Sequence, residues 1–206
     1  MMKQPSDFDV AATEWDQNVE RRQFLDRILV ALFSRMEVLP DMTLIDYGCG
    51  TGNTALPVAE KARHVYGVDT SQGMLSELHK KLGDQGIDNV TPLCLDLSRT
   101  GFVFSAVDAV FSVLTLHHVP DIDPLLGNLA AAIKPGGRIF LIDLYAEDGN
   151  FHRDDELVPH LGFDPDALCA KLQALGFENC RHDLAAIRKR KDNEYPVFII
   201  SADKRH

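Results

Sequence analysis

Three glycines spaced two residues apart follow a short apolar run in the sequence LIDYGCGTG. The run predicts a strand, and Gly48, Gly50 and Gly52 predict a turn at which backbone amides approach a ligand closely. The spacing is Gly-x-Gly-x-Gly, whereas a dinucleotide fingerprint is Gly-x-Gly-x-x-Gly. Asp46 stands two residues before the turn, where a carboxylate would repel a pyrophosphate and attract an ammonium group. The turn is therefore predicted to hold a nucleotide-type ligand that carries a cationic part.

Two further carboxylates end the next two expected strands. Asp69 lies 21 residues after Gly48, where doubly wound folds place the carboxylate that binds a ribose. Asp96 ends the strand in LCLDL, where it and the amide of Leu97 can read the amino edge of an adenine. Each aspartate is also a common turn former or helix cap, and capping of a helix from Ser71 is the alternative for Asp69. Three carboxylates at neighbouring strand ends favour a site for an adenosine with an amino-bearing tail.

Histidines follow the fourth expected strand and recur in a later irregular stretch. An imidazole titrates near neutral pH and can act as a general base. The candidate bases are His117, His118, His152 and His160, of which His117 and His152 are the predicted catalytic residues. We expect His117 to line the site and His118 to cap a turn or face solvent. The later stretch also holds His160 and the acidic residues Asp154, Asp155 and Glu156. Their spacing matches no metal-site pattern, so the sequence predicts no metal.

The elements that position these residues alternate along the chain, which predicts a doubly wound α/β fold with a mostly parallel sheet. The expected helices are residues 15–36, 53–62, 71–82 and 122–133, and the expected strands are residues 43–47, 65–69, 90–95, 108–113 and 138–144. A further helix begins at Pro165, after an N-cap aspartate. Two last strands, residues 179–188 and 195–202, read as an antiparallel hairpin joined by the polar turn 189–194.

Length and charge narrow the class of protein. With 206 residues and no linker-like stretch, the chain reads as one domain, residues 1–206. The net charge of −10 disfavours nucleic acid as a partner, and the one basic cluster, residues 188–191, reads as the solvated end of the hairpin. No apolar run is long enough for a membrane span, and no signal peptide is evident, so a cytoplasmic protein is expected.

Four cysteines are present: Cys49, Cys94, Cys169 and Cys180. No pair has metal-ligand spacing, and no disulfide framework is indicated. All four are expected to be reduced.

The motifs IDYGCGTG, YGVDTSQGML, CLDL, FSVLTLHHVPD and IKPGGRIFLIDL, taken in this order, resemble those of the class I S-adenosylmethionine-dependent methyltransferases. The resemblance covers about residues 40–145, and the terminal strand pair matches the seven-stranded, Rossmann-like sheet of that family. It implies that the three turn glycines line the methionine portion of the cofactor and that Asp46 helps to place its amino group. It also implies that Asp69 binds the ribose and that Asp96 with Leu97 binds adenine.

The same resemblance places Met74 on the adenine face, although an ordinary core position on its helix is an equal alternative. Val113 to His117 would border the sulfonium and the acceptor. Trp15 either covers the cofactor or packs its helix onto the sheet.

The expected activity is methyl transfer from S-adenosylmethionine to an O, N or C atom of a small-molecule acceptor, by in-line displacement. Residues 1–38 would form an N-terminal helical cap, and residues 146–163 a substrate-side loop. The alternatives are methylation of RNA or protein, a module that binds S-adenosylmethionine without turnover, and a dehydrogenase with a divergent glycine turn.

Overall fold

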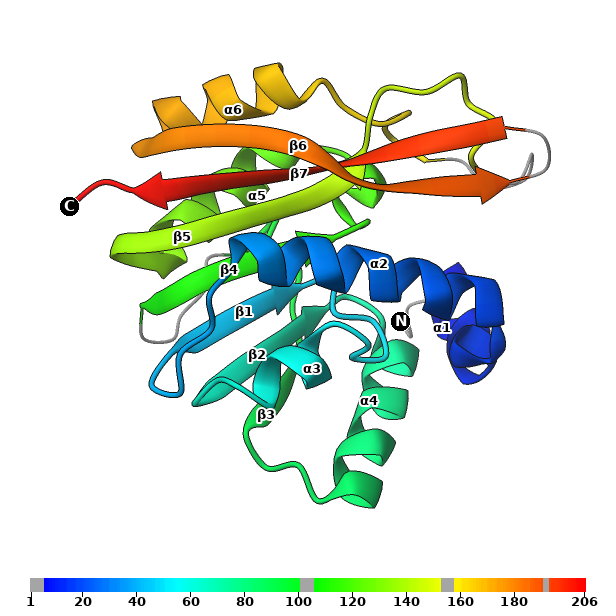
Figure 1. Cartoon of the computed structure of the whole chain (residues 1–206). Helices are drawn as coiled ribbons and strands as arrows, with labels where there is room; N and C mark the ends of the chain where they lie inside the picture. The colour runs from blue at the N-terminus through cyan, green and yellow to red at the C-terminus, as the bar shows by residue number, and fades with distance from the viewer. Residues whose placement is uncertain (1–5, 101–105, 153–157, 191–192) are drawn as a thin grey trace.

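A single seven-stranded sheet organises the computed structural model, which describes residues 6–100, 106–152, 158–190 and 193–206 (Figure 1). The strand order is β3-β2-β1-β4-β5-β7-β6. The strands are β1 (Thr43–Tyr47), β2 (His64–Asp69), β3 (Val90–Cys94), β4 (Val107–Val113), β5 (Ile133–Leu144), β6 (Phe177–Arg190) and β7 (Asn193–Lys204). The first five strands pair in parallel, and β7 pairs antiparallel with both β5 and β6. This confirms the predicted doubly wound sheet with an antiparallel C-terminal hairpin.

Helices cover both faces of the sheet. They include α2 (Val19–Arg35), α3 (Ala55–Ala59), α4 (Gln72–Gln85), α5 (Ile122–Ala132) and α6 (Pro165–Ala174). One buried cluster joins α2, α3 and α4 to Leu44 and Phe140, and a second joins α5 and α6 to Ile45 and Leu141. Neighbouring residues of one strand thus belong to opposite clusters, because successive side chains of a strand point to opposite faces. This explains the continuous apolar runs in the central strands.

The N-terminal region is more finely divided than the sequence predicts. The expected helix over residues 15–36 is a 3-10 helix, η1 (Ala12–Gln17), followed by α2, which begins after the N-cap Asn18. A short helix, α1 (Asp7–Ala11), precedes them and is held by a capping box between Ser6 and Asp9. None of its residues is buried, so it has no apolar periodicity from which a helix could be predicted.

Several other boundaries differ by a few residues. The helix expected over residues 53–62 is limited to α3, and β5 extends back to Ile133 through the Pro-Gly-Gly segment. Both hairpin strands are longer than expected, and their far ends extend past the rest of the sheet (Figure 1). Among the described helices, none has the length and apolar character that crossing a membrane requires.

The expectation that all four cysteines are reduced is wrong for one pair. Cys169 on α6 and Cys180 on β6 form a disulfide, with their Cα atoms 5.7 Å apart, whereas Cys49 and Cys94 are free. The two bonded residues are 11 positions apart in the chain, and the turn at Gly176 folds the strand back against the helix. That proximity comes from helix-to-strand packing, which the cysteine spacing alone does not reveal.

Removing this disulfide is expected to destabilise the protein. Cross-linking a loop of this length contributes about 2–3 kcal/mol, so Cys180→Ser should lower the melting temperature by about 5–10 °C. Thermal unfolding of the variant and of Cys94→Ser, which changes an exposed free thiol, provides the comparison. Titration of unfolded, unreduced protein should find two thiols, and finding four would contradict the assignment.

Candidate functional site

The glycine turn lies at the carboxyl edge of the parallel strands, directly after β1. Gly48, Gly50 and Gly52 all have positive φ angles, of 74°, 53° and 85°, a region that side chains other than glycine rarely adopt. The amides of Gly48 and Cys49 donate to the carbonyl of Val68 at 2.7 and 3.1 Å, which ties the turn to β2. A Cβ atom on Gly48 would lie 2.1 Å from Oγ1 of Thr115, whereas one on Gly50 would meet no described atom within 4 Å. The turn is thus packed at Gly48 and open at Gly50.

Asp46 is completely buried at the end of β1. Its Oδ2 accepts a 2.5 Å hydrogen bond from Thr54, and its Oδ1 has no hydrogen-bond partner among the described residues. Burial raises the pKa of this carboxyl to about 7, although the Thr54 hydroxyl opposes the shift. A buried carboxylate oxygen without a donor is costly. It therefore suits a cationic ligand that supplies one.

Asp69 lies at the end of β2, beside the glycine turn. Its two carboxylate oxygens accept hydrogen bonds from the amides of Gly50 at 2.8 Å and Ser71 at 2.9 Å. Burial raises the pKa of Asp69, and the amides of Ser71 and Gly50 oppose this shift. The carboxylate fixes the conformation of the turn and keeps lone pairs available for ribose hydroxyls. The N-cap of α4 is Ser71, whose hydroxyl accepts a hydrogen bond from the amide of Met74, so Asp69 is not the N-cap residue.

The expected adenine-side residues differ in their surroundings. Asp96 is partly exposed and accepts from the amide and hydroxyl of Ser98 and from Arg99, so it already stabilises its own turn. Leu97 is buried, and its carbonyl accepts from Asn128 at 2.8 Å. Met74 is buried but belongs to neither hydrophobic cluster, whereas Val113 belongs to the first.

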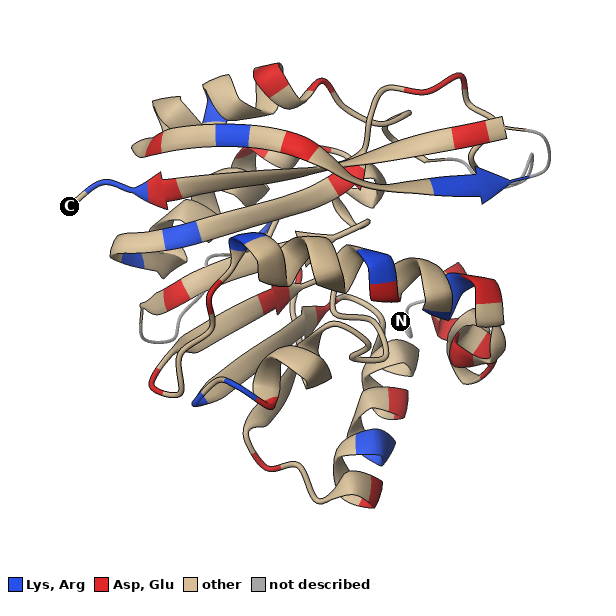
Figure 2. Ribbon diagram, viewed as in Figure 1, with Lys and Arg blue, Asp and Glu red and all other residues tan. Residues whose placement is uncertain are grey.

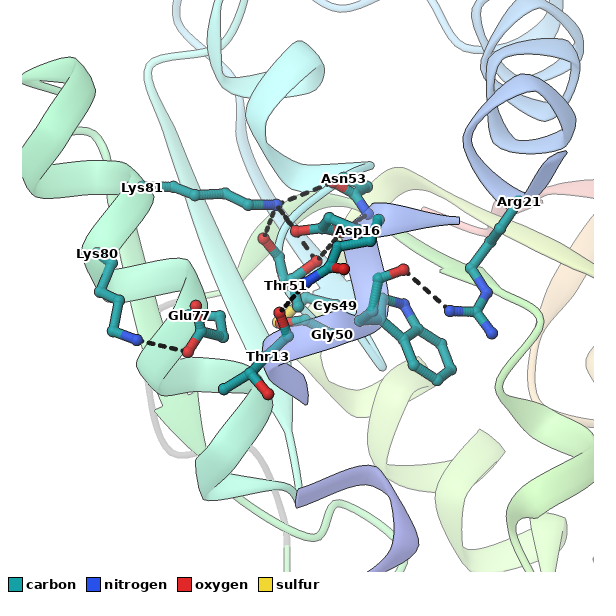
Figure 3. A network of polar contacts seen from close by, with 12 residues as sticks. Thr13, Asp16, Arg21, Cys49, Gly50, Thr51, Asn53, Glu77, Lys80 and Lys81 are labelled. Atoms are coloured by element: carbon teal, nitrogen blue, oxygen red, sulfur yellow. Dashed lines mark hydrogen bonds and ion pairs between the residues drawn. The ribbon is translucent and has the colours of Figure 1, made fainter. Parts of the chain in front are cut away.

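A polar network fastens the N-terminal segment to the glycine turn (Figure 3). Oδ1 of Asp16 accepts from Thr51 at 2.8 Å and from Asn53 at 2.7 Å, and its Oδ2 pairs with Lys81 at 2.8 Å. Burial acts to raise the pKa of Asp16, but the hydrogen bonds from Lys81, Asn53 and Thr51 outweigh it and lower the pKa. The network joins η1, the glycine turn and α4 through charged groups.

A second N-terminal carboxylate caps α4. Oδ1 of Asp9 accepts from the hydroxyl of Ser71 at 2.6 Å and from the amide of Gly73 at 2.8 Å. These hydrogen bonds, that from Ser71 first, keep the pKa of Asp9 below its usual range. Sequence reasoning missed both Asp9 and Asp16, because long-range hydrogen bonds leave no periodic signal in a polar segment.

Three histidines from two segments of the chain lie together. His117 and His118 belong to the 3-10 helix η2 (Leu116–His118), and His152 belongs to the loop after β5. Ring centroids of His117 and His118 lie 4.1 Å apart, and that of His152 lies 5.0 and 5.3 Å from these two. The structure thus brings His117 and His152 together. The expectation that His118 caps a turn or faces solvent is wrong, because its ring packs in this cluster.

A buried carboxylate orients the first of these rings. Nδ1 of His117 lies 2.6 Å from Oδ1 of Asp143 on β5, and both side chains are at most 2% exposed. Because the carboxylate accepts, Nδ1 is the donor, and Nε2 is the ring nitrogen that this hydrogen bond leaves unused. Burial, followed by the charges of His117 and His152, lowers the pKa of His118 to about 3. His118 is therefore a neutral imidazole at neutral pH.

Aromatic residues border the histidine cluster. Phe8 of α1 lies 5.0 Å from His118 and 5.8 Å from Trp15, and Phe151 lies 5.0 Å from His152. Trp15 is thus joined to the histidine side of the site through Phe8, while the guanidinium of Arg21 lies 3.7 Å from the centre of its ring.

Three other predictions concern residues that are not part of the histidine cluster. The ring of His160 pairs elsewhere, with Nε2 3.0 Å from the carbonyl of Val119, while its amide donates to the carbonyl of His117 at 3.3 Å. The acidic residues 154–156 lie outside the described residues. At the hairpin end, Arg188 donates to the carbonyl of Glu20 and Lys189 pairs with Glu194, so part of this basic cluster serves packing and pairing.

A strained backbone position links β4 to η2. Leu114 has a φ angle of 52°, and its amide donates to the carbonyl of Ile142 at 2.8 Å. Such conformations persist where the surroundings enforce them, and they cluster at functional sites. Here the bend turns the chain so that Thr115 packs on Gly48 and His117 reaches Asp143. A leucine gives no sequence signal for this conformation.

Comparisons with known proteins agree with this geometry. Residues 44–137 match a family model described as a methyltransferase domain. Phosphoethanolamine N-methyltransferase 2 of Caenorhabditis elegans is 33% identical over 109 residues, which are 52% of this chain and 25% of that protein. Aklanonic acid methyltransferase DauC of Streptomyces sp. strain C5 is 28% identical over 137 residues, which are 61% of this chain and 62% of that protein.

A similar fold is found in a chain of the complex that contains the Trm112 methyltransferase activator of Haloferax volcanii. It has a TM-score of 0.81 and 18% identity, covering 99% of this chain and 100% of that chain. Over residues 44–137 the chain is thus similar to methyltransferase domains, in line with the resemblance of its motifs. The chain spans between 25% and 62% of the length of four curated relatives, which are 26–33% identical to it over the matched residues.

Proposed function

We propose that this protein binds S-adenosylmethionine at the glycine turn and transfers its methyl group to a small-molecule acceptor by in-line displacement. The observation that carries the proposal is the buried Oδ1 of Asp46, which has no hydrogen-bond donor among the described residues, and the glycine turn that follows it is open at Gly50. An ammonium group would supply that donor. The open face leaves room for the chain that carries it.

The other cofactor-binding residues follow from their places around the turn. Gly48, Gly50 and Gly52 would line the methionine portion, and Asp69 would accept hydrogen bonds from the ribose. The adenine would lie between Met74 and the Asp96–Leu97 segment, and Val113 would border the sulfonium. When bound, the cofactor supplies an activated methyl group, so that the protein has mainly to align donor and acceptor.

The acceptor side would be formed by the described parts of the predicted N-terminal cap and of the predicted substrate-side loop, which are residues 6–38 and residues 146–152 and 158–163. Figure 2 shows acidic residues gathered in α1 and η1, which disfavours a phosphate backbone at this face. The named curated relatives include methyltransferases of phosphoethanolamine and of aklanonic acid, both small molecules. A small-molecule acceptor is therefore preferred to RNA or protein.

The histidine cluster would assist the acceptor in losing its proton. His117 and His152 come from different segments, and their rings lie 5.0 Å apart on the acceptor side. An acceptor hydroxyl, thiol or protonated amine must lose a proton before or during transfer. These two side chains are therefore the proposed catalytic residues.

Calorimetric titration tests the cofactor assignment. S-Adenosylmethionine should bind the purified chain with a stoichiometry of one, and NAD should not bind. A screen of small acceptors should then yield S-adenosylhomocysteine. Binding of NAD instead would overturn the proposal, and binding without product from any acceptor or cell extract would support a module without turnover.

The affinity for S-adenosylmethionine should rise with pH. Only the ionised form of Asp46 attracts the ammonium group, and its pKa of about 7 means that little carboxylate is ionised in the free protein at acidic pH. Between about pH 5.5 and pH 7.5 the ligand amine stays largely protonated, and the affinity should increase about tenfold. Titrations across this range measure the change. Asp46→Asn should bind weakly with a flat profile, and a wild-type profile that is equally flat would contradict the role of Asp46.

A further inference from the structure

The three clustered histidines have the geometry of a metal site. One ring nitrogen from each of His117, His118 and His152 lies within 4.8 Å of the others. Three ligands on a tetrahedral zinc ion lie about 3.3 Å apart, as follows from Zn–N distances of about 2.0–2.1 Å. Small rotations of the rings would therefore bring the three nitrogens onto one ion. The sequence predicts no metal from the spacing of His152, His160 and the nearby carboxylates. The three clustered histidines have no recognised metal-site spacing either, because two are adjacent and the third is 34 positions further along the chain.

The surroundings of the cluster match those of metal-binding imidazoles. Asp143 fixes His117 with Nδ1 protonated, so Nε2 is the nitrogen that can bind a metal. Carboxylates commonly orient the far nitrogen of a ligating histidine in this way, and they raise its basicity. Asp143 is itself held by the amide of Leu144 at 2.7 Å, which makes the pair rigid. The aromatic rings of Phe8 and Phe151 give the cluster an apolar border.

The donor set also indicates which ion would bind and how. Imidazole nitrogens prefer zinc and similar first-row transition metals to magnesium or calcium, which prefer oxygen ligands. Three protein ligands leave a coordination position open, as in catalytic zinc sites. A purely structural site would instead close the coordination shell with a fourth side chain.

We propose that His117, His118 and His152 bind a divalent transition metal, with zinc as the reference ion, and that an acceptor heteroatom occupies its open position. The part concerning the acceptor rests on the proposed methyltransferase function. A hydroxyl, thiol or amine bound to the ion is more acidic, so its proton passes to solvent. The freed electron pair forms the new bond to the methyl carbon while the carbon–sulfur bond breaks, and the sulfur leaves as a neutral thioether. In this arrangement the histidines promote proton loss through the ion rather than as free bases.

Metal binding is tested on untagged full-length protein freed of metal with a chelator. Equilibrium dialysis against zinc, followed by elemental analysis, should give one tightly bound ion per chain, and Co²⁺ should produce the visible spectrum of a four-coordinate site with three nitrogen ligands. His152→Ala, on the loop, should lower the zinc affinity at least about 100-fold. Asp143→Asn should lower it about 10–100-fold while leaving all three ligands in place.

A matched control separates this site from other histidines. His182 lies on β6, paired with Asp166 at 3.1 Å, and His182→Ala should leave the zinc affinity unchanged. Circular dichroism checks that each variant is folded. Wild-type protein that binds no zinc, or a folded His152→Ala variant that keeps the full affinity, would overturn the proposal and identify the cluster as stacked neutral imidazoles.

The same samples distinguish this inference from the proposed function. S-Adenosylmethionine is titrated into the metal-free and the zinc-loaded protein. Cofactor binding without zinc binding overturns the metal site alone. Zinc binding without cofactor binding supports the metal site and overturns the methyltransferase proposal.

Discussion

Asp69→Ala is expected to weaken the binding of S-adenosylmethionine by about 100-fold or more. A carboxylate that accepts two ribose hydroxyls makes two charge-assisted hydrogen bonds, each worth about 1.5–3 kcal/mol. The same substitution frees the amides of Gly50 and Ser71, which Asp69 holds at 2.8 and 2.9 Å. Loss of direct contacts and loosening of the turn therefore act in the same direction. Calorimetric titration at neutral pH measures the effect.

Two further variants separate these contributions. Asp69→Asn keeps one carbonyl oxygen as an acceptor, so its affinity should fall between those of the wild type and Asp69→Ala. Asp84→Ala removes an exposed carboxylate at the far end of α4 and should leave binding unchanged. An Asp69→Ala variant that is folded and binds with wild-type affinity would refute the ribose assignment.

Gly48→Ala is expected to destabilise the protein strongly. The φ angle of 74° is strained for alanine, and the new Cβ atom would lie 2.1 Å from Oγ1 and 2.6 Å from Cβ of Thr115. Since Thr115 cannot escape by rotating its side chain alone, the backbone must move. Strain and overpacking together should cost about 3 kcal/mol or more. Denaturant unfolding measures the change in the free energy of unfolding.

Gly50→Ala is the matched control within the same turn. Its φ angle of 53° also strains alanine, but the new Cβ atom would meet no described atom within 4 Å. The free energy of unfolding should fall by only about 1–2 kcal/mol. The methyl group would project into the space proposed for the cofactor, so the affinity for S-adenosylmethionine should fall more than the stability does. If Gly48→Ala and Gly50→Ala destabilised the protein equally, the conclusion that Gly48 is tightly packed and Gly50 is not would be contradicted.

Much of the fold could be predicted from local sequence patterns. Apolar runs of the right length placed the core strands, and β1 was predicted with the observed bounds. The carboxyl ends of parallel strands share one edge, so the spacing of Asp46, Gly48 and Asp69 was enough to place these residues together. The N-terminal helices were harder to predict, because α1 buries none of its residues and therefore shows no apolar face.

The histidine cluster and the N-terminal contacts could not be predicted, because they join segments that are far apart in the chain. The histidine cluster joins η2 to the loop after β5, and it forms because Leu114 bends the chain and Asp143 on β5 fixes His117. Asp9 and Asp16 reach the cofactor side through hydrogen bonds to Ser71 and Thr51, more than 30 residues away along the chain. The Cys169–Cys180 disulfide likewise requires α6 to pack against β6. No spacing rule describes contacts of this kind.

The sequence by itself determined the sheet, the glycine turn and the carboxylates around it, because hydrophobic period and turn chemistry are local signals and parallel strands end at one edge of the sheet. Only the tertiary structure decided which histidines meet and which carboxylate orients them. Those contacts come from side chains that converge from separate loops, whose paths are set by packing rather than by the residues they contain.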